Sequence, residues 1–256
     1  MKANVSVVIP CYNQGAYLTE CLRSVFNSTV KDVETIIVDD GSDDVRTKQV
    51  LREVQASGVA VHRQHNRGLP AARNVGIGIA TSPFVLPLDA DDLLHPEFIE
   101  KTLAKIIDSP KVGFVTTWVQ RFGQDNLVWK PPRPVLCRML EENVAVSGCL
   151  VRRAAWQAVG GYDERMTSGY EDWDFWLRLL ESKWRGTQVA EPLYFYRVKE
   201  SSMFAVKRSA HEHHVEEIYE RHYRYRRRPR QIIARWVVRA KRNVASIRGP
   251  KETEVQ

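Results

Sequence analysis

Short apolar runs alternate with stretches of helical spacing over the first 92 residues of the chain. The runs have the length of buried strands. The stretches between them carry apolar residues every three or four positions, as amphipathic helices do. We predict strands at 5–9, 33–38, 59–61 and 84–88, and helices at 16–26, 43–54 and 68–80. This alternation is typical of an α/β fold with a mostly parallel central sheet and helices on both faces.

The pattern is less regular after residue 92. We predict helices at 96–107 and from Glu171 onward, and strands at 112–116, 147–152 and 193–197. Residues 121–134 contain three prolines and read as a loop, which is a candidate flap over a site. From about Ser209 the spacing predicts helix to the end of the chain. We therefore expect one domain over 1–205 and a helical C-terminal extension over 206–256.

The apolar run Phe84–Leu88 ends in three acids within four residues, Asp89, Asp91 and Asp92. Ligands of open α/β sheets bind at the carboxyl ends of the strands, where these acids lie. Neighbouring carboxylates repel one another, and a hard divalent cation such as Mg²⁺ or Mn²⁺ would stabilise them. The alternative is an acidic loop that caps the next helix, which begins near Pro96.

The net charge of +7 is unevenly distributed. Residues 1–220 hold 26 Lys and Arg against 29 Asp and Glu, whereas residues 221–248 hold 11 Lys and Arg and no acid. No apolar run approaches the roughly 18 residues that cross a membrane, and the first apolar run is too short for a signal peptide. The four cysteines lack metal-binding spacing and fit reduced thiols. These features predict a cytoplasmic protein.

The basic extension has an apolar stripe. Apolar residues recur every three or four positions from Ile232 to Ile247, around Trp236, with basic residues beside them. A basic amphipathic helix with a tryptophan is typical of peripheral contact with anionic lipid. We predict such a contact through 226–247, on the inner face of the membrane. A helix docked on the body and a dimer contact are the alternatives. We expect no nucleic-acid partner, because no recognition module precedes the basic residues.

Five short motifs give the chain a family resemblance. Taken in order, they are Val7-Val8-Ile9-Pro10-Cys11-Tyr12-Asn13, Val38-Asp39-Asp40-Gly41-Ser42, Ala72-Arg73-Asn74-Val75-Gly76, Leu88-Asp89-Ala90-Asp91-Asp92 and Tyr170-Glu171-Asp172-Trp173-Asp174. In this order and spacing they resemble family 2 glycosyltransferases, over about residues 4–203. The resemblance implies the GT-A fold, with a nucleotide-binding half over 1–92 and an acceptor half over 93–205.

The family's activity is the inverting transfer of a sugar from a nucleotide-diphosphate sugar to an acceptor hydroxyl. The resemblance therefore implies a nucleotide-sugar donor, with a UDP-sugar favoured, and a glycan or lipid-linked acceptor in cell-surface glycan or polysaccharide synthesis. A rival interpretation is a catalytically silent nucleotide-sugar or glycan-binding scaffold of the same fold. A nucleotidyltransferase is less favoured, because the early glycine-rich loop of that class is missing.

The resemblance also implies the donor-binding residues. It puts Pro10, Tyr12 and Asp40 around the base and ribose, with Asp39 beside them, and it implies that Arg73 reaches the nucleotide or its phosphates. A tyrosine ring can stack on a base, and a carboxylate can accept from a base N–H. Two alternatives stay open. Asp39 and Asp40 could only cap the following helix, and Arg73 could form a salt bridge to the acidic cluster.

The metal motif of the family corresponds to Asp89, Asp91 and Asp92. The resemblance implies that Asp89 faces the ribose and that Asp91 or Asp92 holds Mn²⁺ or Mg²⁺, which bridges the diphosphate. Family members often have a histidine shortly after Tyr-Arg-Val, where this chain has Lys199. A lysine cation cannot ligate a metal, but it can pair with a phosphate. Three later histidines could compensate, although a polar helix face is the favoured interpretation of His211, His213 and His214.

The acidic start of the helix at 171 corresponds to the family's catalytic base. The resemblance implies that Asp172 takes the proton of the acceptor hydroxyl, with Glu171 as the rival. The alternative is an acidic first turn that only complements the helix dipole. Trp173 and Trp176 are candidate stacking surfaces for the acceptor, although core packing is the favoured role of Trp176.

Overall fold

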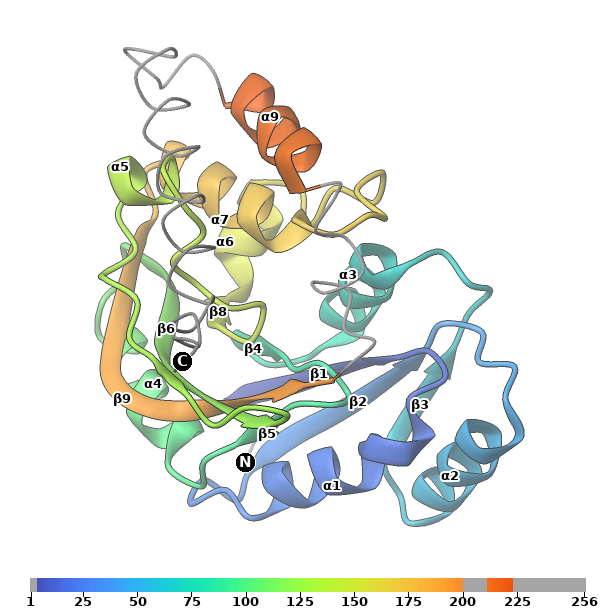
Figure 1. The fold of residues 1–256 in the computed structure, drawn as a ribbon. Coiled ribbons are helices and arrows are strands. Elements are labelled where there is room, and N and C mark those ends of the chain that lie inside the picture. The colour runs from blue at the N-terminus through green and yellow to red at the C-terminus, as the bar shows by residue number, and fades with distance from the viewer. Residues whose placement is uncertain (1–3, 200–210, 223–256) are drawn as a thin grey trace, which may run out of the picture.

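The computed structural model describes residues 4–199 and 211–222, which form a nine-stranded sheet with helices on both faces (Figure 1). The strands are β1 (Val5–Cys11), β2 (Val33–Asp39), β3 (Ala60–Arg63), β4 (Phe84–Pro87), β5 (Leu93–Leu94), β6 (Val112–Gly123), β7 (Val128–Trp129), β8 (Leu150–Arg152) and β9 (Arg185–Val198). The helices are α1 (Gly15–Phe26), α2 (Val45–Ala56), α3 (Leu69–Ile79), α4 (Phe98–Ile106), α5 (Leu136–Met139), α6 (Arg153–Ala158), α7 (Glu171–Glu181) and α9 (His211–Arg221). The strand order is β3-β2-β1-β4-β8-β6-β9-β5, and β7 pairs with β6.

The first half of the sheet is parallel, as the alternating pattern predicts. β1 pairs with β2 on one side and with β4 on the other, and β2 pairs with β3, all in parallel. Every residue of β1 is buried, because both faces of this half are covered by helices. Since the three strands β1, β2 and β4 run the same way, their carboxyl ends meet at one edge of the sheet.

The second half is mixed and holds longer strands than the sequence pattern predicts. β8 lies antiparallel between β4 and β6, and β9 runs parallel to β6 and antiparallel to β5. The prediction of a loop throughout 121–134 is wrong in part, because β6 continues to Gly123 and β7 pairs with Val119–Gln120. The outer parts of β6 and β9 contain many polar residues. Backbone hydrogen bonds to a neighbouring strand stabilise such segments. They lack the alternating apolar residues from which a strand is predicted in a sequence.

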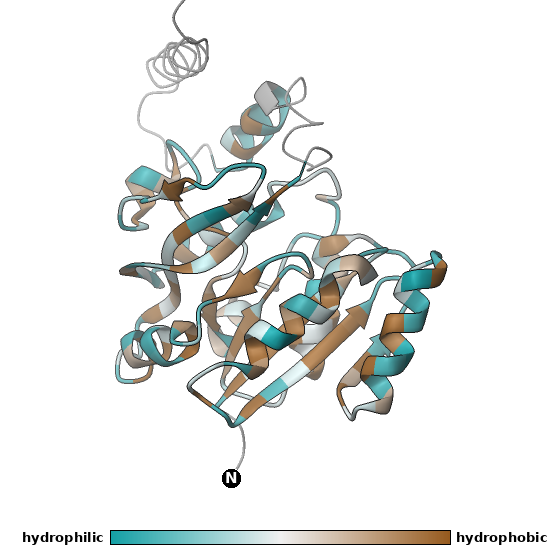
Figure 2. Ribbon diagram, turned by 60° about the horizontal axis from the view of Figure 1, so that its bottom comes forward, coloured by the Kyte–Doolittle hydropathy of each residue, from teal (hydrophilic) through white to brown (hydrophobic). Residues whose placement is uncertain are grey.

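Two apolar clusters fill the space on the two faces of the sheet. On one face, Leu18 of α1, Leu51 of α2 and Phe98 of α4 pack on the odd-numbered residues of β1. On the other face, Ile77 of α3 and Trp176 of α7 pack in a second cluster. Figure 2 shows strands that are brown over long stretches and helices divided between brown and teal. The predicted arrangement of a sheet with helices on both faces is confirmed.

Helix α9 packs on the body of the protein. Val215, Ile218 and Tyr219 are buried in the same cluster as α7, and Arg221 donates to Asp163 Oδ2 at 2.7 Å. His222, the residue after the helix, is also buried. Of the helical extension predicted over 206–256, the structure therefore describes a docked first helix. The predicted boundary at 205/206 and the predicted membrane contact at 226–247 lie outside the described residues.

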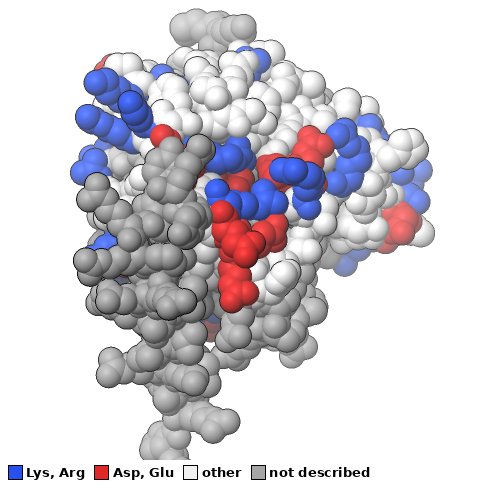
Figure 3. All heavy atoms as spheres, turned by 90° about the horizontal axis from the view of Figure 1, so that it is seen from above, with Lys and Arg blue, Asp and Glu red and all other residues white. Residues whose placement is uncertain are grey.

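Charges of both signs are mixed on the surface. Figure 3 shows Asp and Glu side chains gathered beside Lys and Arg side chains on one face of the molecule. This mixture agrees with the near balance of charge in residues 1–220. Among the described residues, no helix has the length and apolar character that a membrane crossing requires.

Candidate functional site

The predicted donor residues meet at the carboxyl edge of the parallel strands. Pro10 lies within β1, Asp39 ends β2, and Asp89 follows β4. Hydrogen bonds join these strand ends, from Asp40 N to Cys11 O and from Leu88 N to Val8 O, each at 2.9 Å. Residues far apart in the sequence are thus held side by side at the edge where α/β proteins bind ligands.

Asp39 and Asp40 are buried and accept hydrogen bonds from the turns around them. Asp39 Oδ1 accepts from Ser42 N at 2.8 Å. Asp40 Oδ1 accepts from Arg67 N and Asp40 Oδ2 from Gly68 N, each at 2.9 Å. Neither residue caps α2, so that alternative is wrong. The N-cap of α2 is Asp44, which accepts from Thr47 N. The two aspartates therefore shape the loops at this edge, where Tyr12, the residue after β1, is 43% exposed.

Arg73 joins two acidic segments that are distant in the sequence. It lies on α3, its side chain is buried, and its Nη2 donates to Asp89 Oδ1 at 2.7 Å. Its Nη1 donates to Glu171 Oε1 at 2.5 Å. The alternative of a salt bridge to the acidic cluster is therefore what the structure contains. The remaining Asp89 oxygen accepts from Ser147 Oγ at 2.9 Å, a partner that no local motif around Ser147 marks in the sequence.

Asp92 is buried beneath the turn and is held by β9. Its Oδ2 accepts from Tyr194 Oη at 2.7 Å, and its Oδ1 accepts from Arg197 N at 2.8 Å. Burial, together with the charges of Asp91 and Asp89, raises the pKa of Asp92 well above its ordinary value. Asp92 does not cap α4, whose N-cap is Glu97, so the capping alternative is wrong for this residue.

Asp91 has a different environment from its two acidic neighbours. Its side chain remains 22% exposed, and its Oδ2 lies 2.5 Å from the Nζ of Lys199. Within residues 4–199 and 211–222, no three His, Cys, Asp or Glu side chains form a cluster ready to hold a metal ion. The three acids of the turn are thus separated by their partners, which are Arg73 for Asp89, Lys199 for Asp91 and β9 for Asp92.

Helix α7 begins with the candidate base. Tyr170, the N-cap, has a left-handed backbone with φ of 66°, and Glu171, Asp172 and Asp174 follow in the first turn. Asp172 Oδ1 accepts from Trp173 N at 2.7 Å, and its Oδ2 accepts from Asn143 Nδ2 at 3.2 Å. Burial and the neighbouring charge of Glu171 raise the pKa of Asp172 to about 7. Such a carboxylate is suited to proton transfer near neutral pH.

The tryptophans of α7 belong to the core. Trp173 is 2% exposed and Trp176 is fully buried. The indole Nε1 of Trp173 donates to Met139 O at 2.6 Å. The prediction of Trp173 as a stacking surface for the acceptor is therefore wrong, whereas the core role of Trp176 is confirmed. On α9, His213 is exposed and the ring of His214 lies 5.3 Å from that of Tyr170.

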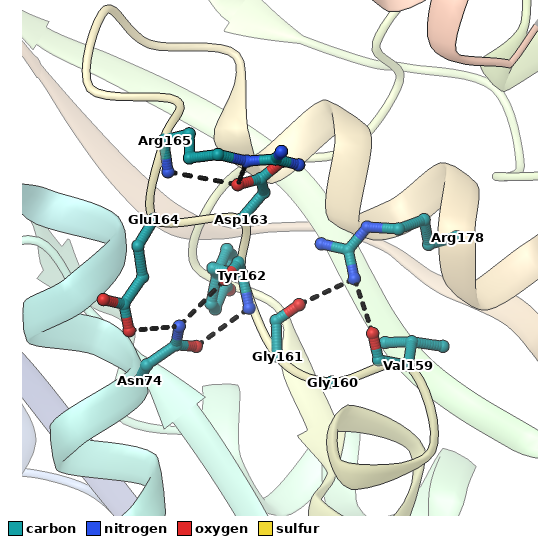
Figure 4. Close-up of a pocket in the computed structure, with 9 residues that line it drawn as sticks. All are labelled: Asn74, Val159, Gly160, Gly161, Tyr162, Asp163, Glu164, Arg165 and Arg178. Carbon is teal, nitrogen blue, oxygen red and sulfur yellow. Dashed lines mark hydrogen bonds and ion pairs between the residues drawn. The ribbon is translucent and has the colours of Figure 1, made fainter.

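A hollow of about 440 Å³ lies beside this network and contains none of the predicted site residues (Figure 4). Asn74 organises its floor, because its Oδ1 accepts from Tyr162 N at 2.8 Å and its Nδ2 donates to Tyr162 O at 2.9 Å. Arg178 Nη1 donates to Val159 O and Gly161 O. Asn74 therefore holds the turn around Gly161, while its neighbour Arg73 faces the acidic cluster.

The chain matches a known family over most of its length. The profile described as Glycosyl transferase family 2 matches residues 6–215. An uncharacterized glycosyltransferase of Methanocaldococcus jannaschii is 26% identical over 208 residues, which are 77% of this chain and 71% of that protein. The chondroitin synthase of Escherichia coli is 29% identical over 189 residues, which are 69% of this chain. That alignment spans only 26% of the synthase.

Solved structures share the fold. S. aureus TarS 1–349 in complex with UDP-GlcNAc has a TM-score of 0.67 at 22% identity and covers 80% of this chain, while the chain covers 61% of it. The mannosyltransferase PcManGT of Pyrobaculum calidifontis, in complex with GDP-Man and Mn²⁺, has a TM-score of 0.68 at 18% identity. It covers 90% of this chain, and the chain covers 66% of it. With sheet order, motif order and family profile in agreement, the chain has the GT-A fold and belongs to glycosyl transferase family 2.

Proposed function

We propose that this protein transfers a sugar from a nucleotide-diphosphate sugar to an acceptor hydroxyl, with inversion at the anomeric carbon. The observation that carries the proposal is the ion-pair network of Arg73. Through it, the acidic turn after β4 and the first turn of α7 are fixed relative to each other. Inversion by direct displacement needs a base opposite the leaving group, and this network holds a candidate base near the candidate donor site.

Asp172 is the proposed base. Its carboxylate is oriented by Trp173 N and Asn143, and its pKa of about 7 makes it an effective proton acceptor at neutral pH. Glu171 is engaged by Arg73, so a role in charge compensation suits it better. In this proposal Asp172 accepts the acceptor hydroxyl proton as the oxygen attacks the sugar.

The proposed donor is a UDP-sugar. The exposed ring of Tyr12 offers a stacking surface for the base at the sheet edge. Pro10, Asp39 and Asp40 would form the floor of that site. S. aureus TarS is a neighbour in complex with UDP-GlcNAc, and PcManGT is one in complex with GDP-Man. Both nucleotides therefore belong in any screen.

Mn²⁺ or Mg²⁺ is the proposed cofactor, with Asp91 as the principal ligand and Asp89 beside it. The partly exposed carboxylate of Asp91 fits this role. Magnesium is commonly bound by one or two carboxylates plus substrate phosphates, so a ready cluster of three protein ligands is not required. Bound there, the ion would act as a Lewis acid toward the diphosphate. The oxygens of Asp92 are engaged by Tyr194 and Arg197, so we assign Asp92 a supporting role.

The proposed biological setting is the synthesis of a cell-surface glycan or polysaccharide. Relatives named chondroitin synthase and hyaluronan synthase support this setting. The chain covers 26% and 19% of those two proteins. The acceptor is therefore proposed only as a glycan or a lipid-linked sugar.

The test is nucleotide-sugar turnover by three proteins. The wild type should release UDP slowly from at least one UDP-sugar in the presence of Mn²⁺. Asp172→Asn should bind that donor with nearly unchanged affinity and turn it over about 10²-fold more slowly, as loss of a general base predicts. Near-normal turnover by Asp172→Asn with loss in Glu171→Gln would move the base to Glu171. Donor binding by the wild type without any turnover would instead favour a silent scaffold.

A further inference from the structure

The ammonium of Lys199 makes three contacts. The residue directly follows β9, and its Nζ lies 2.5 Å from Asp91 Oδ2. The same ammonium donates to Gln14 Oε1 at 3.3 Å and lies 4.6 Å from the ring centroid of Tyr17. The Lys199 side chain is 19% exposed. An exposed surface lysine seldom has so many partners, because holding a long side chain in one geometry has an entropic cost.

The end of β9 is tied to the acidic turn. Arg197 Nε donates to Asp91 O, and Arg197 N donates to Asp92 Oδ1, each at 2.8 Å. The guanidinium of Arg197 also pairs with Glu20 of α1. The backbone two residues before Lys199 is thereby fixed against the turn. Lys199 meets Asp91 because the strand brings it there.

Asp91 is the one acid of the turn whose partner can move away. Asp89 is paired with a buried arginine, and Asp92 is buried under β9. The Asp91 carboxylate is paired with an ammonium on a flexible four-carbon stem, which is a compact cation suited to phosphate oxygens. A negatively charged diphosphate arriving beside Asp91 would attract the same ammonium.

Resting on the function proposed above, we propose that Lys199 is a built-in counter-cation that occupies the metal-binding oxygen of Asp91 and turns to the diphosphate when donor binds. Before donor binds, the ammonium and a divalent cation compete for Asp91. Lys199 supplies part of the positive charge that the diphosphate needs, so the protein depends less on metal for nucleotide binding than it would without this lysine.

The test is a comparison of nucleotide affinity with and without metal. UDP and GDP are titrated by calorimetry into the wild type and into Lys199→Met, in EDTA and in Mn²⁺. The wild type should bind the nucleotide in EDTA, and Mn²⁺ should increase that affinity only modestly. In EDTA, Lys199→Met should bind the nucleotide at least about tenfold more weakly than the wild type. In Mn²⁺ its affinity should recover, because the ion then meets Asp91 without a competitor. Asp91→Asn in the Lys199→Met background should abolish that recovery.

Two controls keep the result interpretable. Lys101→Met removes a lysine that is also 2.5 Å from a carboxylate, that of Glu191, but lies on the exposed surface, and it should change neither affinity. Lys199→Gln, with folding checked by circular dichroism, replaces Lys199→Met if the latter is unfolded. An equal gain from Mn²⁺ in the wild type and the neutral variants would overturn the role of Lys199 alone. Absence of UDP and GDP binding in every protein would contradict the proposed function itself.

Discussion

Arg73 is a single buried cation that serves two acidic segments. It pairs with Asp89, 16 residues later, and with Glu171, 98 residues later. The ion pair with Glu171 is buried on both sides. Removing one partner of a buried pair is costly, because the remaining charge loses its compensation.

We expect Arg73→Met to lower the free energy of unfolding by about 3–5 kcal/mol, the range typical of a broken buried ion pair. Urea unfolding at pH 7 measures this change. Arg67→Met is the matched control, since Arg67 pairs with Glu164 on the exposed surface and should cost less than about 1 kcal/mol. Equal losses in the two variants would contradict the central place given to Arg73.

The raised pKa of Asp172 predicts the pH dependence of turnover. A base acts when ionised, so kcat/KM should fall as the pH drops through about 7, the pKa of this group. Asp172→Asn should lack this acid limb. Glu171→Gln should keep the limb but shift it to lower pH, because the charge of Glu171 contributes to the raised pKa. An acid limb unaffected by both changes would assign the titration to another group.

Single residues differ in how far sequence could predict them. Short local motifs contain Asp89, Asp91 and Asp172, so the sequence was sufficient to identify these residues as candidates for the site. Neither Ser147 nor Asn143 could be paired with these acids in advance, because side chains 58 and 29 residues apart meet only through tertiary packing. A salt bridge from Arg73 to the acidic cluster was one of two alternatives, and its second partner, Glu171, lies 98 residues away.

The bounds of elements with a regular apolar period were predicted closely. The bounds of strands stabilised mainly by pairing with a neighbour were not. β1 and α1 have clear apolar periods, and their predicted bounds agree with the structure to within two residues. β9 extends eight residues further toward its N-terminus than the predicted start at 193. Its polar first half lies in register with β6 from Val112 onward. Such a strand is defined by its neighbour rather than by its own side chains.

Helix α9 is fastened to α7 by a histidine at its end. His222 Nδ1 lies 2.7 Å from Glu181 Oε1, and its Nε2 lies 3.2 Å from Asp174 Oδ1. Burial lowers the pKa of His222, but the hydrogen bonds and charges of these two carboxylates outweigh it, so the pKa is raised above its ordinary value. The protonated ring is therefore the form that holds the helix.

This arrangement predicts a pH-dependent contribution to stability. Because the folded pKa is raised, the contribution is fully present below the unfolded value of about 6.5 and is lost as the pH rises through the folded pKa. The stability difference between wild type and His222→Gln should be on the order of 1 kcal/mol at pH 6 and should shrink by pH 9. Chemical unfolding at both pH values measures it. His213→Gln, on the exposed side of α9, should show no such difference, and a pH-independent loss in His222→Gln would refute the charged contact.

At the scale of the whole molecule, charge separates the body from the C-terminal segment. Residues 1–220 are nearly neutral, whereas residues 223–248 contain ten Lys and Arg and no acid. The packed helix α9 and His222 belong to the body. A shortened chain that ends at residue 222 therefore keeps every contact described for that helix.

We predict that the full chain co-sediments with anionic vesicles and that the chain ending at residue 222 does not. Each basic residue near an anionic surface is worth about 1 kcal/mol, and salt screens exposed charges over about 8–10 Å. Binding of the full chain should therefore weaken at high salt, while both chains keep their affinity for UDP. Equal sedimentation of the two chains would disprove the membrane contact. Loss of folding in the shortened chain would mean that the segment after residue 222 is a structural part of the body.

The position of β9 has a consequence for biosynthesis. Although β9 is the last strand among the described residues, it lies between β6 and β5 inside the sheet. As the polypeptide leaves the ribosome, the strands β3, β2, β1 and β4 can associate first. About a hundred residues beyond the acidic turn must then be synthesised before Tyr194 and Arg197 can bind Asp92. A nascent or prematurely terminated chain would thus carry a half-built sheet, and its candidate site would be complete only once β9 has paired.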